Sequence, residues 1–393
     1  MSSLQQAKYS HEMIRKMKPT RVRAFAPPTI ANVGPGYDMF GVCLDTNGIV
    51  GDFVDAERTD DFSGVQLDAI INDPGLDEPN VCVITANEIL RASGQHIGIR
   101  LKLTKGMRKG TGMGSSAASS VATAIAVNAL LKNPFPKDHP VMINAVIAGE
   151  ATAIRKLRGH ADNVLPCLLG GFVFIHNQQT FEYVRFDVPG TIGFVLASPH
   201  YELSTADMRD ALNGTPYDIN KLVEHASRMV MACHKNPTLT ISSRSGVKAG
   251  LNLYECFDGG VIEKDGGSRD YVLDYILGSI AVYRGLTEGK SSLLGASVMS
   301  DDIVTSVRLP FIPGGANMCQ NALVAGAFGS CISGSGPSMF SVFEWLGVSE
   351  GHALDSRLAI SNAMHDTFLT AGLESDILVA QVCNEGARIV FAE

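Results

Sequence analysis

The chain has 393 residues, of which 45% are hydrophobic, and its formal net charge is −8. This length and hydrophobic content predict two domains with well-filled cores and argue against disorder. An acidic chain offers no basic face for nucleic-acid phosphates, so we expect no nucleic-acid partner.

The cysteines and the apolar runs bear on the cellular compartment. The cysteines form no CxxC pair, and a chain of this size needs no disulfide staples, so we expect reduced, mostly buried thiols. No apolar run reaches the ~18 residues of a membrane-spanning helix, and residues 1–19 lack the apolar core of a signal peptide. We therefore expect a cytoplasmic protein with no membrane contact. A plastid or mitochondrial address stays open, although Glu12 and the scarcity of arginine in this segment argue against one. The cysteines are Cys43, Cys82, Cys167, Cys233, Cys256, Cys319, Cys331 and Cys383.

Apolar runs, glycine turns and helical stretches alternate along the chain, as in a mixed α/β protein. We expect an N-terminal extension over residues 1–20, a first domain over 21–195 and a second domain over 196–393. Polar, proline- and glycine-punctuated sequence between Asn213 and Ser268 predicts a largely irregular insertion. One helix, Ile219–Ala232, is predicted within it.

A glycine-rich segment lies between a predicted strand and a predicted helix. Apolar and polar residues alternate over Ile97–Leu103, which predicts the strand. The helix, Ser115–Leu131, consists almost wholly of small or apolar residues, so we expect it to be buried on most sides. Gly110–Ser116 lies before it, where glycines let backbone N–H groups approach an anion at the helix start.

The last part of the chain has a further series of predicted elements. Each rests on apolar patterning bounded by glycine or proline. They are a helix over Tyr271–Leu286, a glycine cluster over 332–338, an apolar stretch over 339–343, a helix over Ala353–Ala371 and a strand over Arg388–Phe391.

Three other interpretations compete for the Gly110–Ser116 segment. A P-loop requires a lysine after its last glycine, and none follows Gly114. A dinucleotide fingerprint requires glycine at the position of Ser115 and a place after the first strand, which makes it a weak alternative. A tight turn without a ligand remains open. Ser115 and Ser116 add a further choice, because either one can cap the helix or bind the Mg²⁺ that accompanies ATP.

Four further segments, in a fixed order, make the pattern specific. They are PPTIANVGPGYDMFGVCL (27–44), GEATAIRKLRGHADNVLPCLLGGF (149–172), PHYELSTADMR (199–209) and ISGSGPS (332–338). Together with GMGSSAAS, they resemble the GHMP small-molecule kinases, and most closely the homoserine kinases among them. The resemblance runs from about Arg21 to the end of the chain, without the insertion.

The resemblance implies a fold and a reaction. The fold would be α+β, a two-domain GHMP kinase fold with an N-terminal domain similar to ribosomal protein S5 domain 2 and a ferredoxin-like C-terminal domain, with ATP and substrate in the cleft between them. The reaction would be transfer of the γ-phosphate of ATP to the hydroxyl of L-homoserine, in threonine biosynthesis, with Mg²⁺ as the accompanying ion. The sequence leaves the oligomeric state open, with a homodimer as one expectation.

The resemblance also implies roles for single residues at the nucleotide. Mg²⁺ would be bound by Ser116 and Glu150. ATP would be contacted by Lys109, Gly110, Thr111, Gly112, Met113, Gly114, Ser115, Ser116, Ala117 and Ser119.

A second set of roles concerns the acceptor. The ammonium of homoserine suits Asp38, and its carboxylate suits the guanidinium fork of Arg308. Catalysis would involve Asp162, Asn163 and Arg209, with Asp162 either the general base or a residue that only orients its neighbours. Homoserine would be contacted by Asn32, Asp38, His160, Asn163, Thr205, Arg209 and Arg308.

Simpler interpretations accompany these roles. Asn32 lies beside the GPG sequence, and this position by itself is more typical of a turn residue than of a substrate contact. Arg209 and Arg308 alone would be ordinary salt-bridge partners, and Glu150 a solvated helix residue. Two other functions also remain: a GHMP-type kinase acting on mevalonate or a sugar, and a catalytically silent nucleotide-binding relative.

Overall fold

The computed structural model describes residues 9–73, 80–153, 160–237, 240–242, 250–252, 269–345 and 350–393. These residues form two compact units. The first contains the residues up to Ile30, Gly41–Gly171 and Val382–Glu393; the second contains Ala31–Phe40 and Phe172–Gln381. The chain therefore passes between the units more than once. The domains expected at 21–195 and 196–393, and the extension over 1–20, stay predictions.

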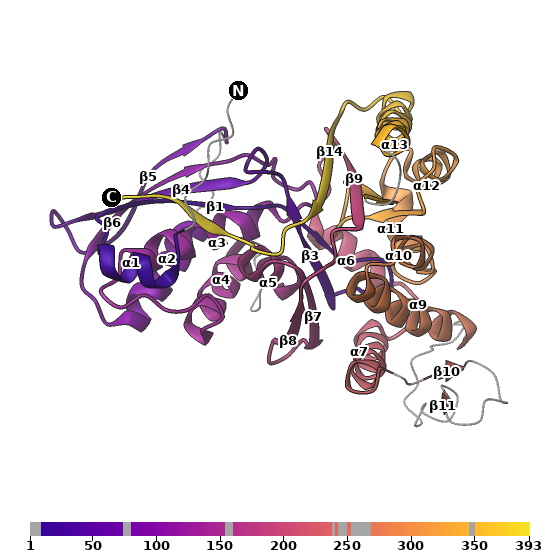
Figure 1. The fold of residues 1–393 in the computed structure, drawn as a ribbon, viewed down its shortest axis with the longest axis horizontal. Helices are drawn as coiled ribbons and strands as arrows, with labels where there is room; N and C mark the ends of the chain where they lie inside the picture. Colours follow the sequence, from indigo (N-terminus) through magenta and orange to yellow (C-terminus); the bar gives the residue numbers. More distant parts are fainter. Residues whose placement is uncertain are drawn as a thin grey trace. The chain divides into compact units, whose positions relative to one another are not determined.

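A five-stranded sheet forms one layer of the first unit (Figure 1). In order across the sheet, its strands are β15 (Arg388–Ala392), β1 (Arg21–Ala26), β4 (Asp52–Thr59), β6 (Gly98–Thr104) and β5 (Gly64–Ile71). Neighbouring strands are antiparallel except β5 and β6, which are parallel. Ile99, Leu101 and Leu103 of β6 are buried, as their alternation predicts.

Helices cover one face of this sheet (Figure 1). The helix α3 (Ser115–Ala129) packs against β1 and β4, and every one of its residues except Ser116 is buried. The prediction of a helix buried on most sides is therefore confirmed. The other helices of this unit are α1 (His11–Met17), α2 (Val81–Ser93), α4 (Pro140–Ala153) and α5 (Ala161–Leu169).

Three backbone hydrogen bonds connect distant parts of the first unit. Cys43 lies in β3 (Phe40–Asp45), which pairs with the short strand β2 (Thr29–Ala31). The N–H of Cys43 donates to the carbonyl of Gly171 over 3.0 Å, the N–H of Gly171 donates to Cys383 over 2.7 Å, and the N–H of Cys383 donates to Cys43 over 2.9 Å. These bonds close a ring among three segments.

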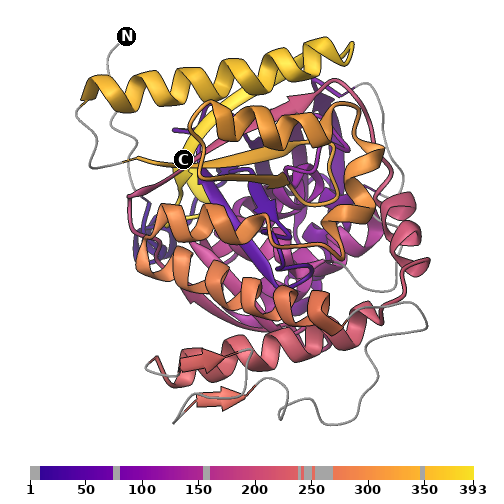
Figure 2. The ribbon, with the colours of Figure 1, turned by 90° about the vertical axis from the view of Figure 1, so that its right-hand side faces the viewer.

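The second unit contains an antiparallel sheet covered by helices. Its strands, in order, are β12 (Gly329–Ile332), β13 (Met339–Glu344), β9 (Ile192–Pro199) and β14 (Ser375–Val382). A hairpin of β7 (Phe172–Asn177) and β8 (Glu182–Phe186) also belongs to this unit. Figure 2 looks onto the helices, which lie in front of the strands. They are α6 (Thr205–Asn213), α7 (Ile219–Lys235), α9 (Arg269–Glu288), α10 (Ser291–Val298), α11 (Thr305–Arg308), the 3-10 helix η1 (Leu309–Phe311), α12 (Gly315–Val324) and α13 (Glu350–Thr370).

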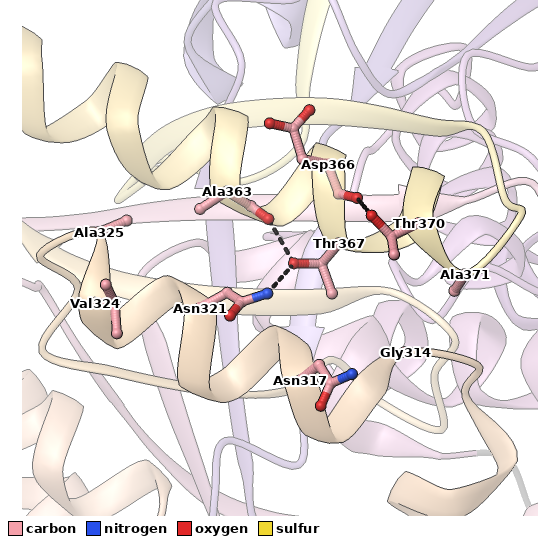
Figure 3. A pocket seen from close by; sticks show the side chains of 10 residues that line it. All are labelled: Gly314, Asn317, Asn321, Val324, Ala325, Ala363, Asp366, Thr367, Thr370 and Ala371. Atoms are coloured by element: carbon pink, nitrogen blue, oxygen red, sulfur yellow. Dashed lines mark hydrogen bonds between the residues drawn. The ribbon is translucent and has the colours of Figure 1, made fainter.

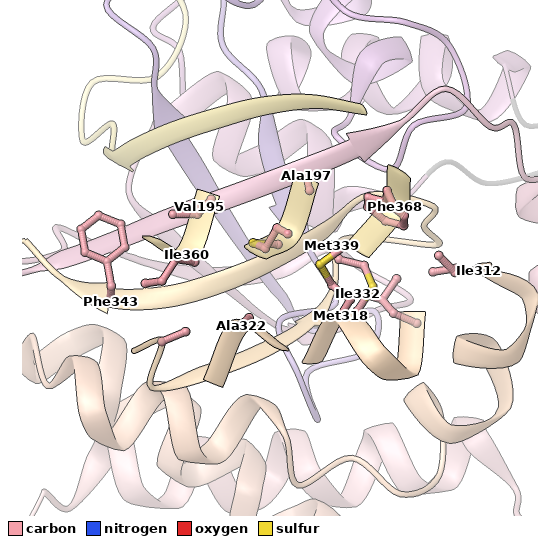
Figure 4. Packing of buried hydrophobic residues seen from close by; sticks show 12 residues of the cluster. Val195, Ala197, Ile312, Met318, Ala322, Ile332, Met339, Phe343, Ile360 and Phe368 are labelled. Atoms are coloured by element: carbon pink, nitrogen blue, oxygen red, sulfur yellow. The ribbon is translucent and has the colours of Figure 1, made fainter. Parts of the chain in front are cut away.

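Buried apolar side chains join α12 and α13 to the sheet of the second unit (Figure 4). Val195 comes from β9, Phe343 from β13, Met318 from α12, and Ile360 and Phe368 from α13. Each of these side chains is at most 2% exposed. This cluster is the hydrophobic core that fixes the helical layer on the sheet.

The elements predicted from the sequence are confirmed within a few residues at their ends. They correspond to β6, α3, α7, α9, β13, α13 and β15. Within the expected insertion, the structure adds the parallel pair β10 (Thr240–Ser242) and β11 (Gly250–Asn252), while residues 238–239, 243–249 and 253–268 lie outside the described residues. The seven cysteines in the described part are free thiols, and six are buried; Cys256 lies outside it. Among the described helices, none has the length and apolar character needed to cross a membrane.

Candidate active site

The glycine-rich segment adopts a backbone that only glycine tolerates well. Gly110, Gly112 and Gly114 have φ values of 71°, 78° and 71°. A Cβ on Gly114 would lie 2.3 Å from Thr29 Oγ1 and 2.9 Å from Asn163 Oδ1. Close packing and backbone conformation thus both require glycine at this position.

The start of α3 has no side-chain cap. Gly114 is the N-cap residue, and it makes no side-chain capping hydrogen bond. The alternative in which Ser115 or Ser116 caps the helix is therefore wrong. The backbone N–H groups of the first turn keep their capacity to bind an anion, which the helix dipole favours.

Ser116 faces the buried carboxylate of Glu150. Glu150 belongs to α4 and is 5% exposed. Burial raises the pKa of Glu150, and a hydrogen bond donated by the Ser116 hydroxyl counteracts part of this rise. Among the described residues, Glu150 Oε2 has no hydrogen-bond partner. A hydroxyl beside an unsatisfied buried carboxylate oxygen is a donor set that fits Mg²⁺, which prefers hard oxygen ligands.

Ser115 and Ser119 face a charged pair that the sequence analysis did not find. Lys105 Nζ donates to Ser115 Oγ over 2.6 Å and to Ser119 Oγ over 2.9 Å. Asp52 forms an ion pair with Lys105, and both side chains are buried. The only signal in the sequence is one charged residue at the beginning of a strand, Asp52 in β4, and another just after the end of a second strand, Lys105 after β6.

The first turn of α5 brings Asn163 to the glycine-rich segment. Thr29 Oγ1 donates to Asn163 Oδ1 over 2.7 Å, and both atoms lie beside Gly114. Asp162 is 3% exposed, and its carbonyl oxygen lies so close to Gly41 that a Cβ there would approach it to 1.9 Å. His160 is the N-cap residue of α5 and makes no side-chain capping bond.

In the second unit, Asn32 and Asp38 shape one loop. Both have positive φ, 54° for Asn32 and 55° for Asp38, which is uncommon for residues other than glycine. The Asp38 N–H donates to Asn32 Oδ1 over 2.8 Å, and Asn32 Nδ2 donates to the Gly334 carbonyl over 3.0 Å. Asn32 therefore shapes this loop, as the interpretation of a turn residue expects, while its contact with a substrate stays a prediction. Asn32 also ties this turn to the ISGSGPS segment.

Two arginines converge on this loop. Arg209 Nη2 donates to both carboxylate oxygens of Asp38. The Arg308 side chain is buried and donates to the carbonyls of Met208, over 3.4 Å, and Gly334, over 3.3 Å. No ion pair of Arg308 occurs within the described residues, so its guanidinium carries a buried positive charge that an anion would complement.

An aromatic ring holds both guanidinium groups, and the sequence analysis missed it. The Cζ atoms of Arg308 and Arg209 lie 4.8 and 5.6 Å from the centroid of the Tyr37 ring. Tyr37 is 5% exposed, and its backbone N–H donates to the hydroxyl of the buried Tyr275 over 3.0 Å. Its place in the GPGYD motif is the signal that sequence reasoning passed over.

Two cavities in the second unit differ in their relation to these residues. One, of about 620 Å³, includes Asp38 in its lining together with polar residues of the β7–β8 turn and α7. The other, of about 500 Å³, lies between α12 and α13 and contains none of the predicted site residues (Figure 3). There Asn321 Nδ2 donates to Thr367 Oγ1 over 2.8 Å, so these two polar side chains satisfy each other.

The predicted site residues therefore form two groups. The first unit contains all residues predicted to contact ATP, together with Glu150, His160, Asp162 and Asn163, and the second contains Asn32, Asp38, Arg209 and Arg308. Thr205 begins α6 in the second unit, but its side chain lies outside the described part of the structure.

Comparisons with known proteins identify the family of the chain. Residues 80–171, which include the glycine-rich segment, match the GHMP kinases N terminal domain. A homoserine kinase from Arabidopsis thaliana is 31% identical over 379 residues, which are 94% of this chain and 84% of that protein. The match to the N-terminal domain is thus accompanied by sequence similarity over nearly the whole chain.

Solved structures give the same family. The crystal structure of homoserine kinase from Cytophaga hutchinsonii superimposes with a TM-score of 0.73 at 29% identity, covering 94% of this chain and 97% of that chain. The structure of L. major mevalonate kinase in complex with R-mevalonate has a TM-score of 0.59 at 13% identity, covers 97% and 99% of the two chains, and shares the fold alone. The chain has the mixed α/β two-domain GHMP kinase fold, and it belongs to the homoserine kinases of the GHMP kinase family.

Proposed function

We propose that this chain transfers the γ-phosphate of ATP to the hydroxyl of L-homoserine and forms O-phospho-L-homoserine and ADP. The observation that carries the proposal is the uncapped start of α3, behind three glycines of positive φ, with Ser116 beside the buried carboxylate of Glu150. This arrangement supplies N–H donors for phosphate and oxygen ligands for its metal ion. Family membership and full-length similarity to homoserine kinases support the choice of acceptor.

For ATP, we infer that backbone N–H groups of the segment 109–117 bind the phosphates. Met113 and Thr111 are buried and hold the loop, since Thr111 Oγ1 donates to the Arg108 carbonyl and the Met113 carbonyl accepts from the Thr29 N–H. Ser115 and Ser119 direct their hydroxyls at Lys105. We therefore propose that Ser119 supports the loop without touching ATP. Ser115 would contact the ATP phosphates through its backbone N–H group.

For Mg²⁺, we propose Ser116 and Glu150 as protein ligands. The unsatisfied Oε2 of Glu150 supports this assignment. When bound, the ion would neutralise charge on the phosphate oxygens during transfer. The protein's own part is to keep the Glu150 carboxylate buried and aimed at Ser116.

For homoserine, we propose that Asp38 binds the ammonium and Arg308 binds the carboxylate. Arg209 holds the Asp38 carboxylate through both oxygens, and Tyr37 holds both guanidinium groups, so the charged atoms are fixed before substrate arrives. Fixed charges lower the ordering cost of binding. His160, Asn163 and Thr205 are further proposed contacts, and Asn32 acts by shaping the loop.

For the proton of the homoserine hydroxyl, we propose Asp162 as acceptor. The hydroxyl oxygen then attacks the γ-phosphorus, and the bond from that phosphorus to the bridging oxygen of ADP breaks. Asp162 is nearly fully buried, which limits competition from solvent. Retention of most of kcat by Asp162→Asn would reduce Asp162 to a residue that orients its neighbours.

The reaction can be tested with the purified chain, ATP and Mg²⁺ and a set of acceptors. We expect ADP release to depend on L-homoserine and to be at least about tenfold lower in kcat/KM with mevalonate or galactose. A preference for mevalonate or a sugar would point to another GHMP kinase. ATP binding without turnover on any acceptor would instead identify a catalytically silent relative.

Three finer expectations belong to the same proposal. They are a homodimer, a cytoplasmic location and a role in threonine biosynthesis. Light scattering on the purified chain measures its mass in solution, and a monomer at micromolar concentration would contradict the homodimer.

A further inference from the structure

Lys105 and Asp52 form a buried ion pair in the first unit, and neither residue belongs to the proposed contacts with ATP or homoserine. Their side chains are 7% and 0% exposed, and Lys105 Nζ lies 2.5 Å from Asp52 Oδ2. Burying two charges is unfavourable unless further hydrogen bonds satisfy the remaining protons and lone pairs. The surroundings of this pair therefore indicate what it holds in place.

The remaining hydrogen bonds connect the pair to the first turn of α3. Lys105 Nζ donates to the Ser115 carbonyl over 3.0 Å, and also to the hydroxyls of Ser115 and Ser119. Asp52 Oδ2 accepts from Ser119 Oγ over 2.6 Å, and Asp52 Oδ1 accepts from the Gly106 N–H over 3.1 Å. An ammonium has three protons, and the acceptors around Lys105 are sufficient for all of them. The pair thus joins β4, the segment after β6 and the start of α3.

The same contacts set the rotation of α3 about its axis. Ser115 and Ser119 are four residues apart, so their side chains lie on one face of the helix. Ser116 follows Ser115 by about 100° of rotation and faces Glu150 instead. A rotation of the first turn would separate Ser115 and Ser119 from Lys105. The same rotation would move Ser116 away from Glu150.

We propose that the Lys105–Asp52 pair is a positioning element of the phosphate-binding segment, which holds the first turn of α3 in the rotation that presents Ser116 and the backbone N–H groups to ATP. The inference rests on the proposed function for the use of ATP. Neither residue touches a substrate in this scheme. The competing role is purely structural, in which the pair contributes only to folding.

Three variants separate the two roles. Lys105→Met and Asp52→Asn each leave one buried charge without its partner and are expected to lower the Tm. The double variant removes both charges, and neutral replacement of a buried pair commonly restores stability. The matched control is the Arg23–Asp55 pair on the same sheet, Arg23→Met with Asp55→Asn, whose atoms lie 3.6 Å apart at a partly exposed position.

The measurements are Tm, the Kd of ATP by titration calorimetry, and the KM values of ATP and homoserine. We expect the double variant to regain most of the Tm while its Kd for ATP stays at least about tenfold above wild type and its homoserine KM stays within about twofold. Ser119→Ala, which keeps the ion pair, is expected to raise the Kd less. The control pair is expected to change neither constant.

An unchanged Kd for ATP in any folded variant that lacks the pair would overturn the positioning role, as would an equal rise of the KM values for ATP and homoserine.

The Kd of ATP is measured without an acceptor. A wild-type chain that fails to phosphorylate homoserine would therefore refute the proposed reaction, while the comparison of Kd values would still decide the role of Lys105 and Asp52.

Discussion

Arg209 Nη2 lies 2.9 Å from Asp38 Oδ1 and 3.1 Å from Asp38 Oδ2, so one guanidinium nitrogen binds both oxygens of the carboxylate. Arg209 comes from α6, and Asp38 is 171 residues away in the chain. The contact fixes the orientation of the Asp38 carboxylate, as a site for a substrate ammonium requires.

The first prediction concerns this carboxylate. Asp38→Asn is expected to lower kcat/KM for homoserine by about 10- to 100-fold, because the substrate ammonium then meets a neutral amide in place of a negative charge. γ-Hydroxybutyrate, which is homoserine without its amino group, should be affected much less. Steady-state kinetics on both acceptors measures the difference. Equal losses on both would contradict an ammonium site at Asp38, and Arg91→Met, at an exposed pair with Glu88 on α2, is the control.

The second prediction concerns the carboxylate of the substrate. Wild type should strongly prefer homoserine over propanolamine, its decarboxylated analogue, and Arg308→Met should remove most of that preference. The physical reason is that the buried guanidinium of Arg308 donates to two carbonyl oxygens, lies over the Tyr37 ring and forms no ion pair among the described residues. An undiminished preference in the variant would place carboxylate recognition elsewhere.

The third prediction uses two glycines of similar backbone conformation. Gly114 has φ 71° and a crowded Cβ position, whereas Gly94 has φ 66° and nothing within 4 Å of that position. Both alanine variants should lose roughly 1–2 kcal/mol in free energy of unfolding from the left-handed conformation. Only Gly114→Ala should lose more than that and also bind ATP more weakly. Equal effects of the two substitutions would show that the loop tolerates a side chain.

The fourth prediction concerns pH and stability. Because burial raises the pKa of Glu150 in the folded chain above its ordinary 4.5, ionisation of this group opposes folding. Its contribution to stability is fully present below pH 4.5 and is lost as the pH rises through the raised value. Glu150→Gln, measured in EDTA, should therefore raise the Tm at about pH 7 and lose this advantage towards about pH 4.

Activity should change in the opposite direction for the same variant. Glu150→Gln is expected to lower kcat at least about tenfold if the carboxylate binds Mg²⁺. Glu12→Gln, at an exposed position, should alter neither property. A lower Tm for Glu150→Gln at neutral pH would contradict a raised pKa of the Glu150 carboxyl.

The fifth prediction tests the core of the second unit. Phe368 is fully buried between α13 and the sheet, and its neighbour Leu369 is 50% exposed. Phe368→Ala should lower the free energy of unfolding by about 3–5 kcal/mol, and Leu369→Ala by much less. Urea denaturation measures both, and similar losses would mean that Phe368 is not part of a closed core.

Much of the fold could be predicted because its signals are local. The alternation in Ile97–Leu103 predicts β6, and the small residues after Gly114 predict a buried helix. The glycines themselves predict a backbone that an anion can approach. Periodicity and turn chemistry act over a few residues, so a single sequence contains them in full.

The contacts that hold the site could not be predicted in the same way. Lys105 and Asp52 are 53 residues apart, and Tyr37 meets Arg308 only through tertiary packing. Nothing near Lys105 in the sequence distinguishes it from a solvated lysine at a strand end. The residues around Asn32 in the sequence favour a turn role. Only the hydrogen bond from its amide to the carbonyl of Gly334, 302 residues away, shows that Asn32 also holds the turn to the ISGSGPS segment.

The ring of hydrogen bonds among Cys43, Gly171 and Cys383 has a consequence for protein synthesis. The first unit takes its edge strand β15, and one member of that ring, from the last twelve residues, Val382–Glu393. A ribosome that has made the whole glycine-rich segment Gly110–Ser116 has therefore not yet made all of the unit that contains it. Folding of this unit during synthesis must wait until residues 382–393 have left the ribosomal exit tunnel, so a truncation before Val382 would disable a unit whose first strand, β1, is made hundreds of residues earlier.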